Sequence, residues 1–475
     1  MFQLCSRILL KQRFILRWIN TDLKLAKGSL ALRFHEYLNR NTDSSSLTKE
    51  SLNNIQHFSV KQIDNEWLKK LEVETNVDDI FKNFAYIIQN IPNQVHNMTF
   101  YIEGIKVLLE NQNVCEKEFV KLCYYIGFLK KNPIGPHYMK NLFKKYFDQL
   151  INQNQLTRTE LAIISIACYK TGVRISNKIF HNRIIEEILD TSDNDHFLFV
   201  SFIKTLKHNQ IYSDEVLHKT KTIIKENDLS YESLIHILPY VTEHTTKDDS
   251  LIQLICDKCI KTFNQQSRAK DMQKFIYSCA LLNFKLSKDD LEKLEKMLLN
   301  RIKNEEFNTH FDHFVNATLS LWILNYHSQK LVNKLFNDDR FYKSGPYSRI
   351  KLDSRMKLLR TCVEIERPEW LKVNKKTSSF NASRPAPSYL IKPSLQKIMN
   401  REVNNKRNAI FVQQINNLNI AGILSTTNEG QIIYYEVLDN QTSLADRKSL
   451  NGIFQLKLRL LEKNNCKYQI VSVLQ

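Results

Sequence analysis

The chain has 475 residues, 43% of them hydrophobic and few of them Gly or Pro, which is typical of a globular, mainly helical protein of two or three domains. Its formal net charge of +18 favours an anionic partner. No stretch approaches the roughly 18 consecutive apolar residues of a membrane span, so none is expected.

The net positive charge comes entirely from the two ends of the chain. Residues 1–40 carry 8 basic and 2 acidic residues, residues 341–475 carry 22 and 10, and residues 41–340 carry 38 of each. Because the middle is equally rich in Lys, a biased composition does not explain this partition. The position of the charge therefore says more about function than its total.

Residues 1–40 resemble a mitochondrial presequence followed by a linker. Bases recur from Arg7 to Lys27 among apolar residues, and Asp22 is the only acid before residue 32. Folded as a helix, this segment is amphipathic with a cationic face, which is typical of a transit peptide. The bases interrupt every apolar run, which argues against a secretory signal, and an ordinary basic N-terminal helix is the alternative.

Four serines stand 37 residues apart in the neutral middle of the chain: Ser176, Ser213, Ser250 and Ser287. Each follows an apolar stretch and precedes an amphipathic one, and Ser is a preferred N-cap. We therefore expect helix-pair units of about 37 residues, which predict an α-solenoid over residues 50–340. Such repeats bind peptides or single-stranded RNA, and the zero net charge does not separate the two.

The next two segments are predicted from charge and proline content. Residues 341–367 carry seven bases and three acids around apolar residues at helical spacing, so a basic helical region is expected. Four prolines and a Lys pair then indicate a Pro/Lys-rich linker over residues 368–403.

Residues 404–475 are predicted to form a small α/β domain. The segments 409–412, 431–438 and 468–474 are short, β-branched or aromatic, and bounded by Asn and Gly, which predicts strands. Residues 450–462 predict a basic helix that ends at Asn464 and Asn465. A helix between the last two strands indicates a small α/β sheet.

Two short motifs stand in this last domain, Glu436-Val-Leu-Asp439 and, after a polar gap, Leu450-Asn-Gly-Ile-Phe-Gln-Leu-Lys-Leu-Arg-Leu-Leu-Glu462. Together they resemble the RAP domain of the FAST-kinase-domain (FASTK) family, in which a presequence, helical repeats and a basic region precede that domain. The detailed match covers about 45 of the 475 residues. The family usually has Gly where this chain has Asn465.

The resemblance implies a protein of the mitochondrial matrix that binds single-stranded RNA. It also implies control of the stability, processing or expression of organellar transcripts, together with other proteins of mitochondrial RNA granules. Bases are the usual contacts to phosphates, and aromatic rings stack on bases. The candidate RNA contacts are Arg447, Lys448, Lys457, Arg459, Lys463, Tyr434 and Tyr435. A solvated helix face is the alternative for the helical bases, and core packing is the alternative for the tyrosines.

The sequence favours a non-catalytic protein. None of its nine glycines lies within five residues of another, which excludes the glycine-rich loops of kinases and P-loop enzymes. RAP domains look similar to a metal-dependent nuclease fold, which makes Asp439 a candidate catalytic carboxylate. The Lys that such a site needs two residues after Glu436 is Leu438 here, so we expect Asp439 to cap the following turn.

No cofactor or metal ion is expected. Cys256 and Cys259 form the one Cys-x-x-Cys, and no second pair stands at zinc-site spacing. Two alternatives to a non-catalytic RNA-binding protein stay open: an adaptor that assembles mitochondrial ribonucleoprotein through protein contacts, and an RNA endonuclease that uses Asp439.

Overall fold

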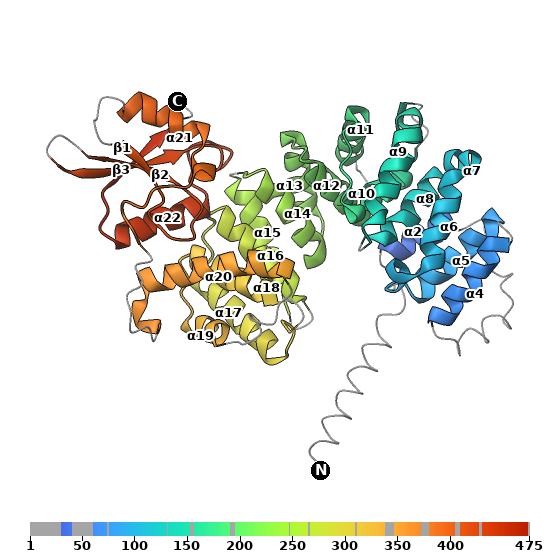
Figure 1. Ribbon diagram of the computed structural model, residues 1–475, viewed down its shortest axis with the longest axis horizontal. Helices are drawn as coiled ribbons and strands as arrows, with labels where there is room; N and C mark the ends of the chain where they lie inside the picture. Colours follow the sequence, from blue (N-terminus) through green and yellow to red (C-terminus); the bar gives the residue numbers. More distant parts are fainter. Residues whose placement is uncertain are drawn as a thin grey trace, which may run out of the picture. The chain divides into compact units, whose positions relative to one another are not determined.

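The structure is a computed structural model that divides into two compact units, residues 1–219 and 220–475 (Figure 1). It describes residues 30–39, 60–73, 76–130, 132–152, 156–190, 195–246, 248–264, 267–308, 311–337, 346–371, 380–403, 409–426 and 430–473. The chain is mainly helical, with a small sheet near its C-terminus, which confirms the expected fold class at that level.

Unit 1 contains only helices and their connections among the residues that the structure describes. The helices are α2 (Leu30–Leu38), α4 (Val60–Val73), α5 (Val77–Asn90), η2 (Val95–Asn97), α6 (Thr99–Glu110), α7 (Gln112–Lys117), α8 (Phe119–Ile126), η3 (Gly127–Leu129), α9 (Ile134–Asn152), α10 (Arg158–Thr171), α11 (Lys178–Leu189), α12 (His196–Asn209) and the start of α13 (Asp214–Glu226).

Unit 2 begins with further helices and ends in the sheet. The helices are α14 (Tyr231–Glu243), α15 (Asp249–Thr262), α16 (Ala269–Leu281), α17 (Lys288–Lys303), α18 (Phe311–Ile323), α19 (Gln329–Phe336), α20 (Pro346–Glu366) and η5 (Pro368–Trp370). The C-terminal domain follows with η6 (Ser388–Leu390), α21 (Pro393–Ile398), the π-helical turn η7 (Met399–Val403), β1 (Ala409–Val412), β2 (Gly422–Thr426), β3 (Ile432–Leu438), α22 (Gly452–Lys463) and β4 (Tyr468–Ser472).

The helices alternate in pairs whose first members start 35 to 42 residues apart, from α8 to α18. This spacing is less regular than the expected 37 residues. Two of the four serines cap helices: the Ser213 hydroxyl accepts from the amide of Val216, and that of Ser287 from the amide of Asp290. At the other two sites the cap is a neighbour, Asn177 for α11 and Asp248 for α15.

The boundary expected for the presequence region was wrong, because residues 30–38 form the folded helix α2. Phe34 and His35 on this helix are buried in unit 1. The hydroxyl of Tyr124 donates to the carbonyl oxygen of Ala31 at 2.8 Å. A helix that supplies core residues belongs to the folded body of the protein. The rest of the expected presequence, residues 1–29, and residue 40 lie outside the described residues.

The expected basic region at 341–367 is one helix over its described part, α20. Apolar side chains at helical spacing, from Leu352 through Leu359 to Val363, are buried along one side of it. Residues 341–345 lie outside the described residues. Among the described helices, none is both long and apolar enough to cross a membrane.

The C-terminal sheet has the strand order β1-β2-β3-β4. The first three strands are antiparallel, and α22 carries the chain across to β4, which pairs in parallel with β3. The crossover and three of the strands were expected from the sequence. Strand β2 was not, because it is short and begins at Gly422, a residue type that is depleted in strands.

Helices cover both faces of this sheet, with α21 on one side and α22 on the other (Figure 1). Successive side chains of β3 alternate between the faces. Tyr435 and Val437 pack with α21, whereas Leu438 packs with α22. Strand β3 is therefore buried on both sides.

The linker expected over residues 368–403 was also placed wrongly, because residues 380–403 belong to the C-terminal domain. Leu390, Leu395 and Ile398 are buried against Tyr435 of the sheet. Residues 380–385 run antiparallel beside β1, with bridges that reach Ile415 and Val412. Pro393 starts α21, at a helix position where a missing N–H costs nothing. Prolines here mark helix starts and a sheet edge, and the domain begins near residue 380 instead of 404.

Candidate nucleic-acid interface

Lys457 was expected on a solvent-facing side of its helix, but the structure buries it in the C-terminal domain. It points from α22 to β3, where its ammonium group donates to the carboxylate of Glu436, and both side chains are 0% exposed. The Gln414 amide donates to the other carboxylate oxygen at 2.8 Å. Burial raises the pKa of Glu436 and lowers that of Lys457, while each charge opposes the shift of the other. Lys457 is therefore a core residue, and the prediction of an RNA contact there was wrong.

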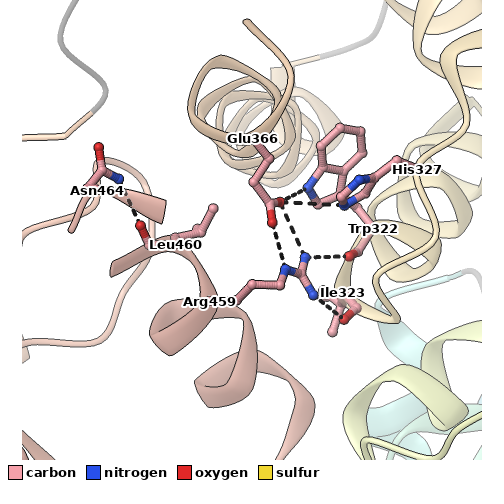
Figure 2. A network of polar contacts seen from close by, with 7 residues as sticks. All are labelled: Trp322, Ile323, His327, Glu366, Arg459, Leu460 and Asn464. Carbon is pink, nitrogen blue, oxygen red and sulfur yellow. Dashed lines mark hydrogen bonds and ion pairs between the residues drawn. The ribbon is translucent and has the colours of Figure 1, made fainter. Parts of the chain in front are cut away.

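Arg459 is two residues after Lys457 on α22, so it points to the other side of the helix and joins α22 to the helices of unit 2. Its guanidinium binds the carboxylate of Glu366 at the end of α20, with Nε 2.7 Å from Oε1. It also donates to the carbonyl oxygens of Trp322 and Ile323 at the end of α18, at 2.8 and 3.3 Å (Figure 2). These carbonyls are the electron-rich end of the helix, where a cation is favourable. Arg459 holds the C-terminal domain to the helices, so it is not available as the RNA contact that the sequence suggested.

Glu366 is the centre of this network, since three side chains share its carboxylate. The indole nitrogen of Trp322 donates to it at 2.5 Å, and the ring of His327 stacks on Trp322 with centroids 4.2 Å apart (Figure 2). Burial lowers the pKa of His327 to about 4, against the effect of Glu366. The imidazole is therefore neutral at physiological pH, and Arg459 is the cation that balances Glu366.

Gly452 shows how closely α22 approaches the helices. It is the first residue of α22, and a Cβ atom there would overlap the carbonyl oxygen of Ala280 on α16. The preceding residue, Asn451, caps the helix by accepting from the amide of Phe454 at 3.0 Å. The Asn-Gly pair of the sequence motif thus starts the helix and permits its close packing.

Both candidate stacking tyrosines are buried. Tyr434 is 3% exposed and Tyr435 is 4% exposed, on opposite faces of the central strand β3. Core packing, the alternative to base stacking, is therefore what the structure shows for both. Because α21 covers the second face, neither ring is open to a base.

Asp439 caps the turn that follows β3. Its carboxylate accepts from the amides of Gln441 and Thr442 at 2.9 and 3.2 Å, and from the hydroxyl of Ser394 at 2.7 Å. This is the structural role expected from the sequence. With these donors around it, the carboxylate ties the start of α21 to the end of β3.

Three of the predicted contacts remain exposed: Arg447, Lys448 and Lys463. Arg447 adopts a left-handed backbone conformation, with φ 56°, in the loop before α22. Lys448 lines a cleft of about 720 Å³ that this loop forms with Asp249 and Lys285 of the helical part of unit 2. Lys463 is at the end of α22. Arg447 and Lys448 are adjacent in the loop before α22, whereas Lys463 is at the other end of that helix. Lys457 and Arg459 bind carboxylates of the protein, so the predicted bases do not form one cluster.

The basic surface of residues 380–401 was not predicted from the sequence, because these residues were assigned to a linker. Residues 380–401 contain no acid. Their exposed cations include Arg384, Lys397 and Arg401, and Tyr389 is 73% exposed. The apolar side chains of this segment face the sheet, so its polar side chains face outward. A stretch with four bases, a tyrosine and no acid could have been recognised in the sequence as a basic surface.

The cysteine pair lies in the helical core. Cys256 and Cys259 are both buried, and the Cys256 sulfur is 3.6 Å from that of Cys279. Burial raises the pKa of the Cys259 thiol. Across the described part of the chain, no group of His, Cys, Asp and Glu is arranged to hold a metal ion.

No protein-family model matches this sequence, and a search of curated proteins finds no match.

Proposed function

We propose that the protein binds single-stranded RNA through the basic surface of its C-terminal domain. The observation that carries this proposal is an imbalance of exposed charge. Residues 380–401 carry no acid, and their Arg384, Lys397 and Arg401 are exposed. This part of the surface is therefore positive, and a phosphate backbone is the complementary ligand.

We place this activity in the mitochondrial matrix, on the basis of the basic amphipathic N-terminus. The helix pairs support an α-solenoid, and the order of strands and crossover helix supports a RAP-like domain. In this proposal the protein acts on organellar transcripts, on their stability, processing or expression, together with other proteins of RNA granules.

The role we propose is binding without catalysis. In a nuclease, the catalytic carboxylates and lysine must be accessible to water, to a metal ion and to the substrate. Glu436 and Lys457 are fully buried, and Asp439 accepts three hydrogen bonds from its own domain. This arrangement supports a structural role for all three residues.

The test is RNA affinity of the full chain as a function of salt, measured by fluorescence anisotropy with a labelled 20-nucleotide single strand. The variant Lys392→Gln, Lys397→Gln, Arg401→Gln removes three bases from the basic segment. Each lost phosphate contact lowers the slope of log affinity against log salt by about 0.7, so the triple variant should lower it by about 2.

The matched control is Lys288→Gln, Lys296→Gln, Lys303→Gln, which removes three exposed lysines of α17. This helix carries acids among its bases, so the slope should not change. Wild-type binding that does not weaken with salt would overturn the proposal, as would an equal loss in the two triple variants.

A further inference from the structure

A second group of cations and rings lies in unit 1, where three neighbouring helices end. Helix α10 packs against both α8 and α12. The side chains at the C-terminal ends of these helices therefore meet. The group, which we call the lysine–aromatic patch, consists of Phe128, Lys130, Tyr169, Lys170, Lys204 and His208.

Lys170 is the central cation of this patch. Its ammonium nitrogen lies 4.3 Å from the centroid of the Phe128 ring, a cation–π distance. The pKa of Lys170 is lowered to about 8, first by burial and then by the charges of Lys130 and Lys204. The lysines thus repel one another, and a bound anion would relieve this repulsion.

An exposed aromatic ring lies directly beside these charges. Tyr169 is 38% exposed, and its ring meets that of His208 edge to face, with centroids 5.8 Å apart at 79°. His208 stands one turn after Lys204 on α12, so Tyr169 and Lys170 face the same side of that helix. A ring beside several ammonium groups is the combination that single-stranded nucleic acids bind, through stacking and phosphate contacts.

Helix capping explains only part of this arrangement. Bases in the last turn of a helix stabilise its dipole, and acids such as Glu118, Glu160 and Asp195 do so at the opposite ends of these helices. Lys204 lies a turn before the end of α12, however, and still adds its charge to Lys170. The dipole accounts neither for that position nor for the exposed ring of Tyr169.

We infer that the lysine–aromatic patch is a second contact site for single-stranded RNA, where Lys130, Lys170 and Lys204 bind phosphates and Tyr169 stacks on a base. The inference rests on the proposed function, because it assigns another site to the same ligand.

The variant Lys130→Gln, Lys170→Gln, Lys204→Gln of the full chain tests the phosphate contacts with the same 20-nucleotide strand. The slope of log affinity against log salt should fall by about 2. The control Lys117→Gln, Lys140→Gln, Lys178→Gln removes three exposed lysines elsewhere in unit 1 and should leave the slope unchanged.

Stacking is tested separately at Tyr169. The variant Tyr169→Ala should weaken binding roughly tenfold, and Tyr169→Phe should bind like the wild type, because Phe keeps the ring. If the hydroxyl were the important group, Tyr169→Phe would lose as much affinity as Tyr169→Ala, and this result would overturn the stacking contact.

Lysine acylation of the wild-type chain, followed by mass spectrometry, tests the site without any variant. At pH 8 a large share of Lys170 is deprotonated and reactive, and RNA should slow its acylation and that of Lys130 and Lys204, but not that of Lys178. This inference is overturned if RNA leaves the acylation unchanged, or if the two triple lysine variants of unit 1 have equal salt slopes. The proposed function would still stand in that case, provided that the Lys392→Gln, Lys397→Gln, Arg401→Gln variant lowers the slope. If wild-type binding does not depend on salt, the inference and the proposed function both fail.

Discussion

Lys457 in the C-terminal domain and Lys170 in unit 1 both stand on helices that pack against neighbours, but their electrical surroundings are opposite. Lys457 donates to the carboxylate of Glu436, whereas the charged neighbours of Lys170 that shift its pKa are Lys130 and Lys204. A buried carboxylate makes the first lysine part of the core. The charges of the neighbouring lysines lower the pKa of the second. The charges that the fold places beside a lysine thus decide its electrical environment.

The largest effect is expected from Lys457→Met. It leaves the Glu436 carboxylate buried without its cation, so the free energy of unfolding of unit 2 should fall by about 3–5 kcal/mol, measured by urea denaturation. Adding Glu436→Leu should restore part of the loss. Lys463→Met on the same helix is the control and should stay within about 0.5 kcal/mol of the wild type. A small loss for Lys457→Met would contradict the core role of the pair.

Arg459→Met should lower the free energy of unfolding by about 2 kcal/mol, because Glu366 loses its cation but keeps the Trp322 indole. Faster hydrogen exchange of the α22 amides would report the loosened contact with the helices. The salt slope of RNA binding should not change. A slope lowered by about 0.7 with normal exchange would instead make Arg459 an RNA contact.

The charge state of Lys170 predicts a smaller, pH-dependent effect. Between pH 7 and 9 it loses its proton, since its pKa is about 8, and RNA affinity at 0.1 M salt should fall roughly fivefold, the value of one phosphate contact. Lys130, Lys204 and His208 also face this site, so the comparison is with Lys170→Gln, in which the fall should be smaller.

The lowered pKa of Lys170 also affects how the stability of the fold depends on pH. The folded pKa of Lys170 lies below the unfolded value of 10.5, so the unfolded chain binds more protons between about pH 8 and 10.5. This group therefore favours folding as the pH rises through that window.

For the RNA-binding prediction, an affinity that does not change from pH 7 to 9 would show that Lys170 is not part of the site.

The smallest effects are expected at the exposed bases that were predicted from the sequence. Lys448→Gln and Lys463→Gln should each lower the salt slope by about 0.7 if the residue contacts a phosphate, with no change in unfolding. The single changes should add, since the two residues lie at separate places. An unchanged slope would mark either residue as part of a solvated surface.

Much of the fold follows from local sequence. The strands β1, β3 and β4 and the helix α22 were predicted within a few residues, because their periodicity and their Asn boundaries are local signals. The errors came where packing decides. Residues 380–403 contain prolines and polar residues, and only the apolar Leu390, Leu395 and Ile398, which fill one face of the sheet, make them part of the domain.

The candidate site was predicted less well, for a physical reason. Composition places the net positive charge at the ends of the chain and gives the middle no net charge. It does not show which bases pair with acids that are distant in sequence. Glu436 is 21 residues from Lys457, and Glu366 is 93 residues from Arg459.

The sequence by itself determined the mainly helical class, the strand–helix–strand order of the last domain and the cap at Asp439, all of which depend on neighbouring residues. Only the tertiary structure decided that Tyr434 and Tyr435 are both buried, that Lys457 and Arg459 bind carboxylates, and that three lysines of unit 1 lie together. Burial and charge pairing depend on residues that are far apart along the chain and close in space, and no local pattern records them.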